Sequence, residues 1–451
     1  MAVRPSTILM CRKLPPREAP HLHHQRDPDK EMTEELFSAC RRALAHELLP
    51  AMGCTEPIAL AYAAAKAGER LGGYPDKIDV EVSRNIVKNV KSVIVPNTGG
   101  LFGIEAAVAA GFVARKPGAG LEVLAGITDE ERAEIARRVK EPMTVRQSEE
   151  PDVFFIRVTG TLAQKSVSVT IRTYHTNITC IEENGASVFY RISAPEDESP
   201  EKDWSIPELI EVARTMPLDE TRPLLERQLE CNLAIAREGL SGSWGASIGK
   251  IILSRNPDDP AVRARAWAAA ASDARMNGCE LPVIIVSGSG NQGITASVPV
   301  AIYGESLGSS REAVLRALLL SDLVTISLKK GIGKLSAYCG AVSAGCGSGA
   351  GIAMLLGMKD DEIEGVISNA LAISSGLLCD GAKSSCAAKI SISVEGALLA
   401  LDMVKHHQVF RSGDGIVQET TDDTAAAVGR IASQGMVDTD REIIRVMLHE
   451  C

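Results

Sequence analysis

Three cysteines that lie far apart in the chain are of the residue type that binds iron. Cys379 and Cys386 belong to the segment 376–390, GLLCDGAKSSCAAKI, and Cys339 opens a glycine-rich segment, 339–356, CGAVSAGCGSGAGIAMLL. Cysteine thiolates are the usual protein ligands of iron–sulfur clusters. We therefore predict that these three thiols hold an iron–sulfur cluster that takes part in catalysis, and that the rest of the chain serves this site.

A fourth cysteine, Cys346, shares the glycine-rich segment with Cys339. If the chain between them is continuous helix, the two residues lie about 10.5 Å apart along its axis, which is long for two ligands of one small cluster. We interpret Cys346 as a packed, small apolar side chain. The alternative is that all four are buried core cysteines, because no short cysteine run fixes the cluster type as a ferredoxin motif does.

The turn between Cys379 and Cys386 contains Gly381. A helix that ends near Leu378 and a second one that begins near Ser384 would bring both thiols together. Three protein ligands on four irons would then leave one iron open, as a Lewis-acid catalyst requires. Such an iron could bind a substrate carboxylate or a leaving group during an elimination.

Cys54 is the candidate catalytic residue because of its place in the segment 53–57, GCTEP. A proline shortly after a threonine is a common signal for the start of a helix. The thiol would then lie near the positive end of a helix dipole, which lowers the pKa of a thiol and favours a reactive thiolate.

The segment 287–295, SGSGNQGIT, follows an apolar run and combines hydrogen-bonding side chains with glycines. We predict that it binds a carboxylate or an amino group; an ordinary glycine turn is the alternative. It lacks the spacing of a Walker loop or a dinucleotide fingerprint, so we do not expect nucleotide binding. The segment 96–100, PNTGG, could supply similar donors. The candidate substrate-binding residues are Ser289, Asn291, Gln292, Asn97 and Thr98.

A pyridoxal phosphate enzyme needs a lysine for its Schiff base and a cup for its phosphate. No lysine of this chain lies in such a context, so we expect no pyridoxal phosphate. Lys383, between two of the predicted iron ligands, is better placed to offset cluster charge.

Composition excludes several classes of protein. A net charge of −10 argues against nucleic acid or an anionic membrane as a partner. Eleven cysteines without a secretory signal are more typical of metal binding than of a disulfide framework. No apolar run reaches the ~18 residues of a membrane span. We expect a cytoplasmic protein whose partner is a small amino acid, and its small-residue helices would suit a homodimer.

The pattern of apolar and polar residues along the chain predicts an α+β protein with several segments. Residues 1–31 read as a disordered tail or a misassigned start, and 32–76 as helices that pack with the C-terminal domain. Alternation at period two then predicts an α+β domain over 77–195, and 205–451 reads as an all-helical catalytic domain. The expected strands are 78–83, 144–148, 153–162, 166–174, 177–185 and 187–192. The expected C-terminal helices are 207–215, 221–238, 260–276, 311–330, 349–357, 360–378, 386–404 and 433–449.

Four motifs carry a resemblance to a known family. They are GCTEPIALAYAAA at 53–65, SGNQGITASVPV at 289–300, CGAVSAGCGSGAG at 339–351 and CDGAKSSC at 379–386. With these motifs the chain resembles the L-cysteine desulfidase family, within the superfamily of iron–sulfur L-serine dehydratases of the alpha-chain type. The similarity runs from about Leu36 to near the C-terminus.

The resemblance implies an oxygen-sensitive 4Fe–4S cluster on Cys339, Cys379 and Cys386, with Cys54 as the catalytic base. It implies α,β-elimination from a small L-amino acid: L-cysteine would give sulfide, ammonia and pyruvate, whereas L-serine would give water, ammonia and pyruvate. We expect a desulfidase; the alternatives are an L-serine dehydratase and a non-catalytic iron–sulfur sensor that binds an amino acid. The terminal Cys451 departs from the pattern, either as a frayed free thiol or as a group that occupies the open iron.

Overall fold

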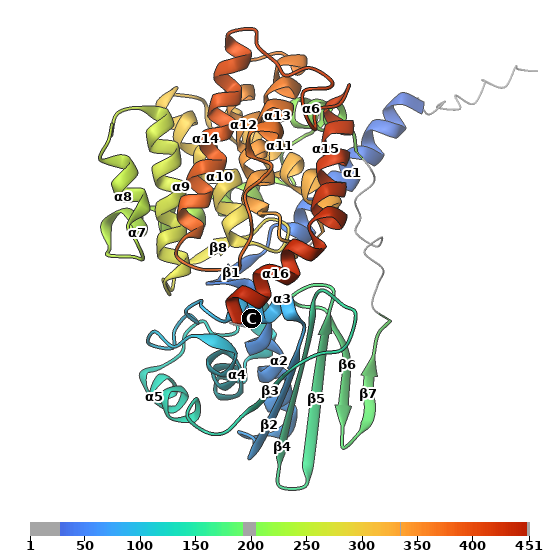
Figure 1. Ribbon diagram of the computed structural model, residues 1–451, viewed down its shortest axis with the longest axis vertical. Coiled ribbons are helices and arrows are strands. Elements are labelled where there is room, and N and C mark those ends of the chain that lie inside the picture. The colour runs from blue at the N-terminus through green and yellow to red at the C-terminus, as the bar shows by residue number, and fades with distance from the viewer. Residues whose placement is uncertain (1–27, 193–203, 334, 449–451) are drawn as a thin grey trace, which may run out of the picture.

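The computed structural model describes residues 28–192, 204–333 and 335–448. It has two lobes, one built of helices and one built around a sheet, with the C-terminal helix lying at their junction (Figure 1). The predictions made for residues 1–27 and for Cys451 lie outside the described residues. The α+β fold class is confirmed.

The sheet lobe contains a six-stranded mixed sheet in the order β3-β2-β4-β5-β6-β7. The β2–β3 pair is parallel and the other pairs are antiparallel. Its strands are β2 (Lys77–Val82), β3 (Thr144–Gln147), β4 (Phe155–Leu162), β5 (Lys165–Arg172), β6 (Ile178–Glu183) and β7 (Ala186–Tyr190). Each of the six overlaps an expected strand. In β2, β4 and β6 buried residues alternate with less buried ones, as the period-two pattern predicts.

Helices cover this sheet. They are α2 (Thr55–Leu71), α3 (Arg84–Val90), α4 (Gly103–Ala114), the 3₁₀ segment η1 (Pro117–Glu122) and α5 (Asp129–Arg138). α2 packs against β4, β5 and α4. A side chain at Gly160 on β4 would meet both Leu71 of α2 and Phe112 of α4, so this face of the sheet is closed by the two helices.

The expected N-terminal unit, 32–76, is divided between the lobes. Helix α1 (Pro28–Glu47) contacts α11 of the helical lobe, whereas α2 packs in the sheet lobe. The reason is the alanine-rich surface of α2: Ala61 lies so close to Gly111 of α4 that a Cβ there would be 2.1 Å from the Ala61 carbonyl oxygen. Such close backbone approach selects a partner helix that also offers a small residue.

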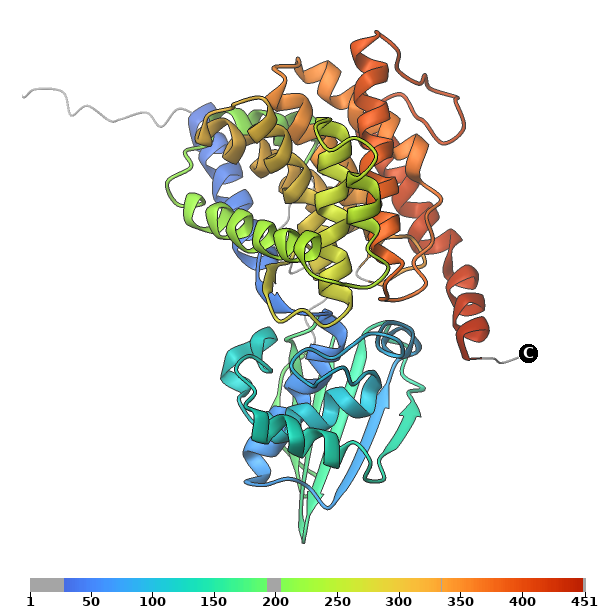
Figure 2. The same cartoon turned by 90° about the vertical axis from the view of Figure 1, so that its left-hand side faces the viewer.

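The helical lobe holds the C-terminal part of the chain (Figure 2). Its helices are α6 (Ile206–Thr215), α7 (Arg222–Ser241), α8 (Ile248–Leu253), α9 (Pro260–Met276), α10 (Gly290–Ser306), α11 (Arg311–Ile332), α12 (Gly340–Leu355), α13 (Asp360–Ser374), α14 (Cys386–Lys405), α15 (Thr421–Arg430), the π-helical turn η3 (Ile431–Gly435) and α16 (Val437–Leu448). Three helices, α8, α10 and α15, were not expected from the sequence. Among the expected ones, α13 ends at Ser374 rather than near Leu378, α12 begins at Gly340 rather than at 349, and α16 begins at Val437 rather than at 433.

A two-stranded sheet joins two distant parts of the chain. β1 (Pro50–Met52) pairs antiparallel with β8 (Pro282–Ile284), and Ala51 lies opposite Val283. Because Cys54 follows β1 and the segment 287–292 follows β8, this pairing brings two of the predicted functional segments side by side. Among the described helices, none combines the length and the apolar character that crossing a membrane would require.

The contact between α2 and α4 gives a stability prediction. Gly111→Ala should lower the free energy of unfolding by about 1–3 kcal/mol, because its Cβ would overlap the α2 backbone. Chemical denaturation would measure the change. Gly118→Ala is the control, since a Cβ there meets no atom within 4 Å; equal effects of the two variants would contradict the packing argument.

Candidate functional site

A cavity of about 110 Å³ lies where α2, α10, α12 and α14 meet. Seven of the nine site residues predicted from the sequence line this cavity: Cys54, Ser289, Asn291, Gln292, Cys339, Cys379 and Cys386. These residues come from four segments that are far apart in the chain. The tertiary structure therefore assembles the motif residues around one small enclosed space.

A short backbone pairing brings Cys339 and Cys379 together. Tyr338 and Leu378 form an antiparallel bridge. Next to it, the Cys339 amide donates to the Leu377 carbonyl at 3.0 Å, and the Cys379 amide donates to the Ala337 carbonyl at 2.6 Å. The segment 375–379 therefore forms this pairing and does not continue the helix, which explains why α13 ends early.

Cys386 is the first residue of α14, as the sequence predicted. The turn that leads to it passes through Gly381, whose φ of 90° favours glycine. A Cβ at Gly381 would lie 2.3 Å from the Lys88 carbonyl oxygen of the sheet lobe, so only glycine fits this approach. The turn carrying Cys379 and Cys386 is therefore pressed against α3.

Four helices direct their N-termini at the cavity. Cys54, Ser289 and Cys339 are the N-cap residues of α2, α10 and α12, and Cys386 opens α14. None of these four helices has a side-chain cap. Helix N-termini present partial positive charge and unpaired N–H groups, so this arrangement favours anions such as thiolates or a carboxylate.

Basic side chains reinforce that preference. The described lining residues include Arg275, Lys329 and Lys389, against a single acid, Glu56. Lys389 pairs with Asp380 and donates to the Leu378 carbonyl at 2.7 Å. Lys383, predicted to offset cluster charge, instead pairs with Asp380 at 2.7 Å outside the lining.

Burial acts against ionisation of the thiols. It raises the pKa of Cys339 to about 12, with a further contribution from the neighbouring Cys379. Burial also raises the pKa of Cys386. A cation in the cavity would offset the lost hydration of Cys339 and Cys386 and so favour their thiolate forms.

Cys54 is hydrogen-bonded to an acid of its own motif. Its thiol donates to Glu56 Oε2 at 3.0 Å. The Thr55 hydroxyl lies 2.9 Å from the Gly288 carbonyl oxygen, which ties the start of α2 to the loop before α10. Cys54, Thr55 and Glu56 are all buried.

The expected low pKa of Cys54 is wrong for this state of the protein. Burial raises its pKa well above 9.0, and the Glu56 carboxylate raises it further. Desolvation and a nearby negative charge outweigh the helix dipole, whose contribution is typically below about 1 kcal/mol. The thiol is therefore protonated, and the adjacent carboxylate is the ionised group.

Glu56 is held in its ionised form by a set of donors. Although burial opposes ionisation, His175 and the hydrogen bond from Cys54 lower the pKa of Glu56 to about 2. Asn89 Nδ2 donates to Glu56 Oε1 at 3.0 Å, and His175 Nε2 lies 4.0 Å from the same oxygen. Asn89 comes from α3 and His175 from the turn between β5 and β6, so the sheet lobe supplies both.

Arg275, at the C-terminal end of α9, is a cavity residue that sequence analysis missed. It is 2 % exposed, and its Nη1 donates to Asn291 Oδ1 at 3.1 Å. Its Nε has no hydrogen-bond partner among the described residues. The guanidinium packs over Gly290, where a Cβ would lie 2.4 Å from Nε. A buried cation with an unused donor is suited to bind a carboxylate.

Gln292 also has an unsatisfied group. Its Oε1 has no hydrogen-bond partner among the described residues, and the side chain is 4 % exposed. The amide lies against Gly340, where a Cβ would be 2.8 Å from Gln292 Cδ. Buried amide oxygens without a partner are uncommon, so this acceptor is available to a ligand such as an ammonium group.

Asn97 and Thr98 do not line the cavity. Asn97 Nδ2 donates to the Leu124 carbonyl at 2.7 Å, and the Thr98 hydroxyl donates to the Val95 carbonyl at 2.7 Å. Their polar groups stabilise a turn within the sheet lobe, so both are dropped from the proposed site. Cys346 is buried within α12 and is likewise absent from the lining.

The missed residues had weak signals in the sequence. Glu56 belongs to the GCTEP motif and could have been singled out as the acid beside Cys54. Arg275, Asn89 and His175 stand in segments without a motif, and only the fold brings them to the cavity. Among the described residues, no three His, Cys, Asp or Glu side chains are grouped as a single metal ion would require.

Comparison with known proteins identifies the family. The family model described as serine dehydratase alpha chain matches residues 118–445. The chain belongs to this family. The matched range contains Cys339, Cys379 and Cys386, whereas Cys54 precedes it.

Relatives extend the similarity to nearly the whole chain. A UPF0597 protein of Desulfitobacterium hafniense is 48 % identical over 93 % of this chain and 99 % of its own length. UPF0597 proteins of Lachnoclostridium phytofermentans and Treponema denticola are 45 % and 42 % identical, over 89 % and 90 % of this chain and 97 % of their own lengths. The names of these relatives specify no activity.

The Cys54–Glu56 contact predicts a shift in thiol reactivity. Glu56→Gln removes the negative charge beside the thiol, so the pKa of Cys54 should fall. The alkylation rate of Cys54 by iodoacetamide would be measured over a pH series by mass spectrometry of its peptide. In Glu56→Gln, the increase of this rate with pH should begin at a lower pH than in the unaltered protein. Glu69→Gln, at a partly exposed position of the same helix, should leave the profile unchanged. An identical profile in Glu56→Gln would disprove the electrostatic coupling.

Proposed function

We propose that this member of the serine dehydratase alpha chain family is an iron–sulfur-dependent lyase that removes the β-substituent and the amino group of a small L-amino acid. The observation that carries the proposal is the single cavity that three thiols share with a fourth, carboxylate-linked thiol and a buried arginine. L-cysteine is the substrate we expect first, with sulfide, ammonia and pyruvate as products. L-serine is the second candidate because of the family description.

The residues present fit a 4Fe–4S cluster. Cys339, Cys379 and Cys386 offer three sulfur donors to one cavity, and four helix N-termini and Lys389 surround them with positive charge. This environment suits a group that carries several anionic sulfurs. When bound, a cluster with three protein ligands supplies an iron with an open position, which is a Lewis acid for the carboxylate and leaving group of a substrate.

The size of the cavity limits the substrate. Pockets for drug-sized ligands measure about 300–1,000 Å³, whereas this cavity measures about 110 Å³. A small amino acid is therefore favoured over a peptide or a nucleotide. Its carboxylate would pair with the unpaired Nε of Arg275, and its ammonium group would meet the unpaired Oε1 of Gln292. Ser289 and Asn291 complete this wall, Asn291 by holding Arg275 in place.

Cys54 is the proposed base, and Glu56 orients its thiol by accepting the hydrogen bond at Oε2. Because the pKa of Glu56 is lowered to about 2, this carboxylate stays ionised and keeps the thiol directed at it. A substrate ammonium group in the cavity would favour the thiolate over the thiol, because an opposite charge nearby lowers a thiol pKa. Cys54 Sγ would then take the α-proton of the substrate. Loss of the β-substituent leaves an aminoacrylate, which tautomerises and hydrolyses to pyruvate and ammonia in water.

The first test of the proposed function is a product assay. Protein purified without oxygen should contain iron and sulfide, and should release pyruvate and ammonia from L-cysteine, from L-serine or from both. Sulfide released in step with pyruvate would identify the desulfidase reaction. Cys54→Ser should retain the iron and lose turnover by about 10²–10⁴-fold, as expected for removal of a general base. If iron-loaded protein yields no product from either amino acid, the result would favour a sensor and disprove the proposed activity.

The ligand assignment has a matched pair of variants. Cys379→Ala should lose most of the bound iron, because one of three protein ligands is removed. Cys346→Ala, in the buried interior of α12 and outside the cavity, should keep it. Iron analysis and visible absorbance would be measured on both proteins. Equal iron content in Cys379→Ala and the unaltered protein would remove Cys379 from the ligand set.

A further inference from the structure

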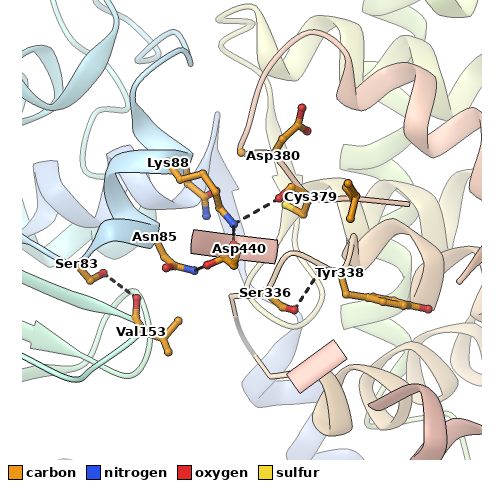
Figure 3. A network of polar contacts seen from close by, with 12 residues as sticks. Ser83, Asn85, Lys88, Val153, Ser336, Tyr338, Cys379, Asp380 and Asp440 are labelled. Carbon is orange, nitrogen blue, oxygen red and sulfur yellow. Dashed lines mark hydrogen bonds and ion pairs between the residues drawn. The ribbon is translucent and has the colours of Figure 1, made fainter. Parts of the chain in front are cut away.

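A buried lysine connects three parts of the chain beside the proposed iron site (Figure 3). Lys88 of α3 pairs with Asp440 of α16 at 2.5 Å, and its Nζ lies 3.5 Å from the Cys379 carbonyl oxygen. Asp440 also accepts a hydrogen bond of 2.8 Å from Asn85. The sheet lobe, the C-terminal helix and the Cys379 segment therefore meet at one ammonium group.

The burial of this pair indicates a specific role. The Lys88 side chain is 1 % exposed and that of Asp440 is 15 % exposed. Removing a lysine from water is costly, and surface ion pairs contribute little to stability. Lys88 is buried, is paired with one carboxylate and points at a main-chain carbonyl. Its main effect is therefore to fix the position of that main chain, and it adds little to the stability of the fold.

The Lys88 main chain makes a second contact with the same segment. Its carbonyl oxygen lies so close to Gly381 that a Cβ there would be only 2.3 Å away. Lys88 therefore touches the chain on both sides of Asp380, through its ammonium group at Cys379 and its carbonyl at Gly381. These two contacts are independent of each other, since one belongs to the side chain and the other to the backbone.

Helix α16 closes a larger cavity at the same place. Asn85, Asp440 and Ile444 line a space of about 730 Å³ between the lobes, and Ser336 lines both this space and the 110 Å³ cavity. A second contact, from Lys91 Nζ to the Met447 carbonyl, also ties α3 to α16. The C-terminal helix thus bridges the lobes over the wall that the two cavities share.

We propose that Lys88 is a positioning residue for Cys379, and that α16 keeps Lys88 in place through Asp440. The inference rests on the proposed function only where it treats Cys379 as an iron ligand; the contact itself exists in iron-free protein. Main-chain support from Lys88 fixes where the Cys379 thiol can lie relative to Cys339 and Cys386. Docking of the C-terminal helix is thereby coupled to the geometry of the proposed iron site.

The test compares Lys88→Met and Asp440→Asn with the unaltered protein. In iron-free protein at fixed pH, iodoacetamide labelling with peptide mass should show several-fold faster alkylation of Cys379 in both variants. The rate at Cys346 is the internal reference, because general loosening of the fold would raise both rates together. In protein loaded with iron, a chelator titration should show affinity lower by about 10–100-fold, as for loss of a group that orients a metal ligand.

Matched controls remove ion pairs elsewhere. Lys66→Met breaks the Lys66–Glu69 pair on α2, and Asp360→Asn breaks the Arg214–Asp360 pair in the helical lobe. Both should match the unaltered protein in Cys379 labelling and iron affinity. If Lys88→Met fails to fold, seen as equal labelling of Cys379 and Cys346, the milder Asp440→Asn decides.

An unchanged ratio of Cys379 to Cys346 labelling in Asp440→Asn would overturn the inference. Failure of the proposed function has a different signature, because the unaltered protein would then hold no iron while the labelling comparison still gives a result.

Discussion

The arrangement that everything else depends on is the meeting of four helix N-termini around one small cavity. Cys54, Ser289, Cys339 and Cys386 stand at or next to those ends. Helix N-termini and buried cations supply a positive potential, which stabilises anionic groups that are bound in the cavity away from water. The glycines of α10 and α12 make the arrangement possible, since Gly290 and Gly340 leave room for side chains that a Cβ would displace.

Burial and charge oppose each other at this site. In the protein alone, desolvation keeps the thiols of Cys54, Cys339 and Cys386 protonated. The same low-polarity surroundings strengthen any interaction with a cation that enters, because Coulomb energies grow as the effective dielectric constant falls.

The two lobes share responsibility for the site. The helical lobe supplies the three proposed iron ligands, whereas the sheet lobe supplies Asn89 and His175 to Glu56 and Lys88 to the Cys379 segment. Helix α2 begins at the cavity and continues into the sheet lobe, and α16 closes the junction from the other end of the chain (Figure 1). The proposed chemistry therefore depends on the relative placement of both lobes.

Local patterns in the sequence were enough to predict the strands of the sheet, the helix that begins near Thr55 and the helix that begins at Cys386. They also predicted which residue types line the cavity. Alternation, helix-start signals and chemical identity are all properties of short segments. Tertiary structure alone decided the rest. The Tyr338–Leu378 bridge cut α13 short, burial reversed the expected ionisation of Cys54, and Asn97 and Thr98 went to a turn. Arg275 became a site residue through its contacts with Gly290 and Asn291 of α10, and Lys88 through contacts with Cys379 and Asp440, hundreds of positions away in the chain. Such contacts between elements, and the desolvation they cause, leave no local trace in the sequence.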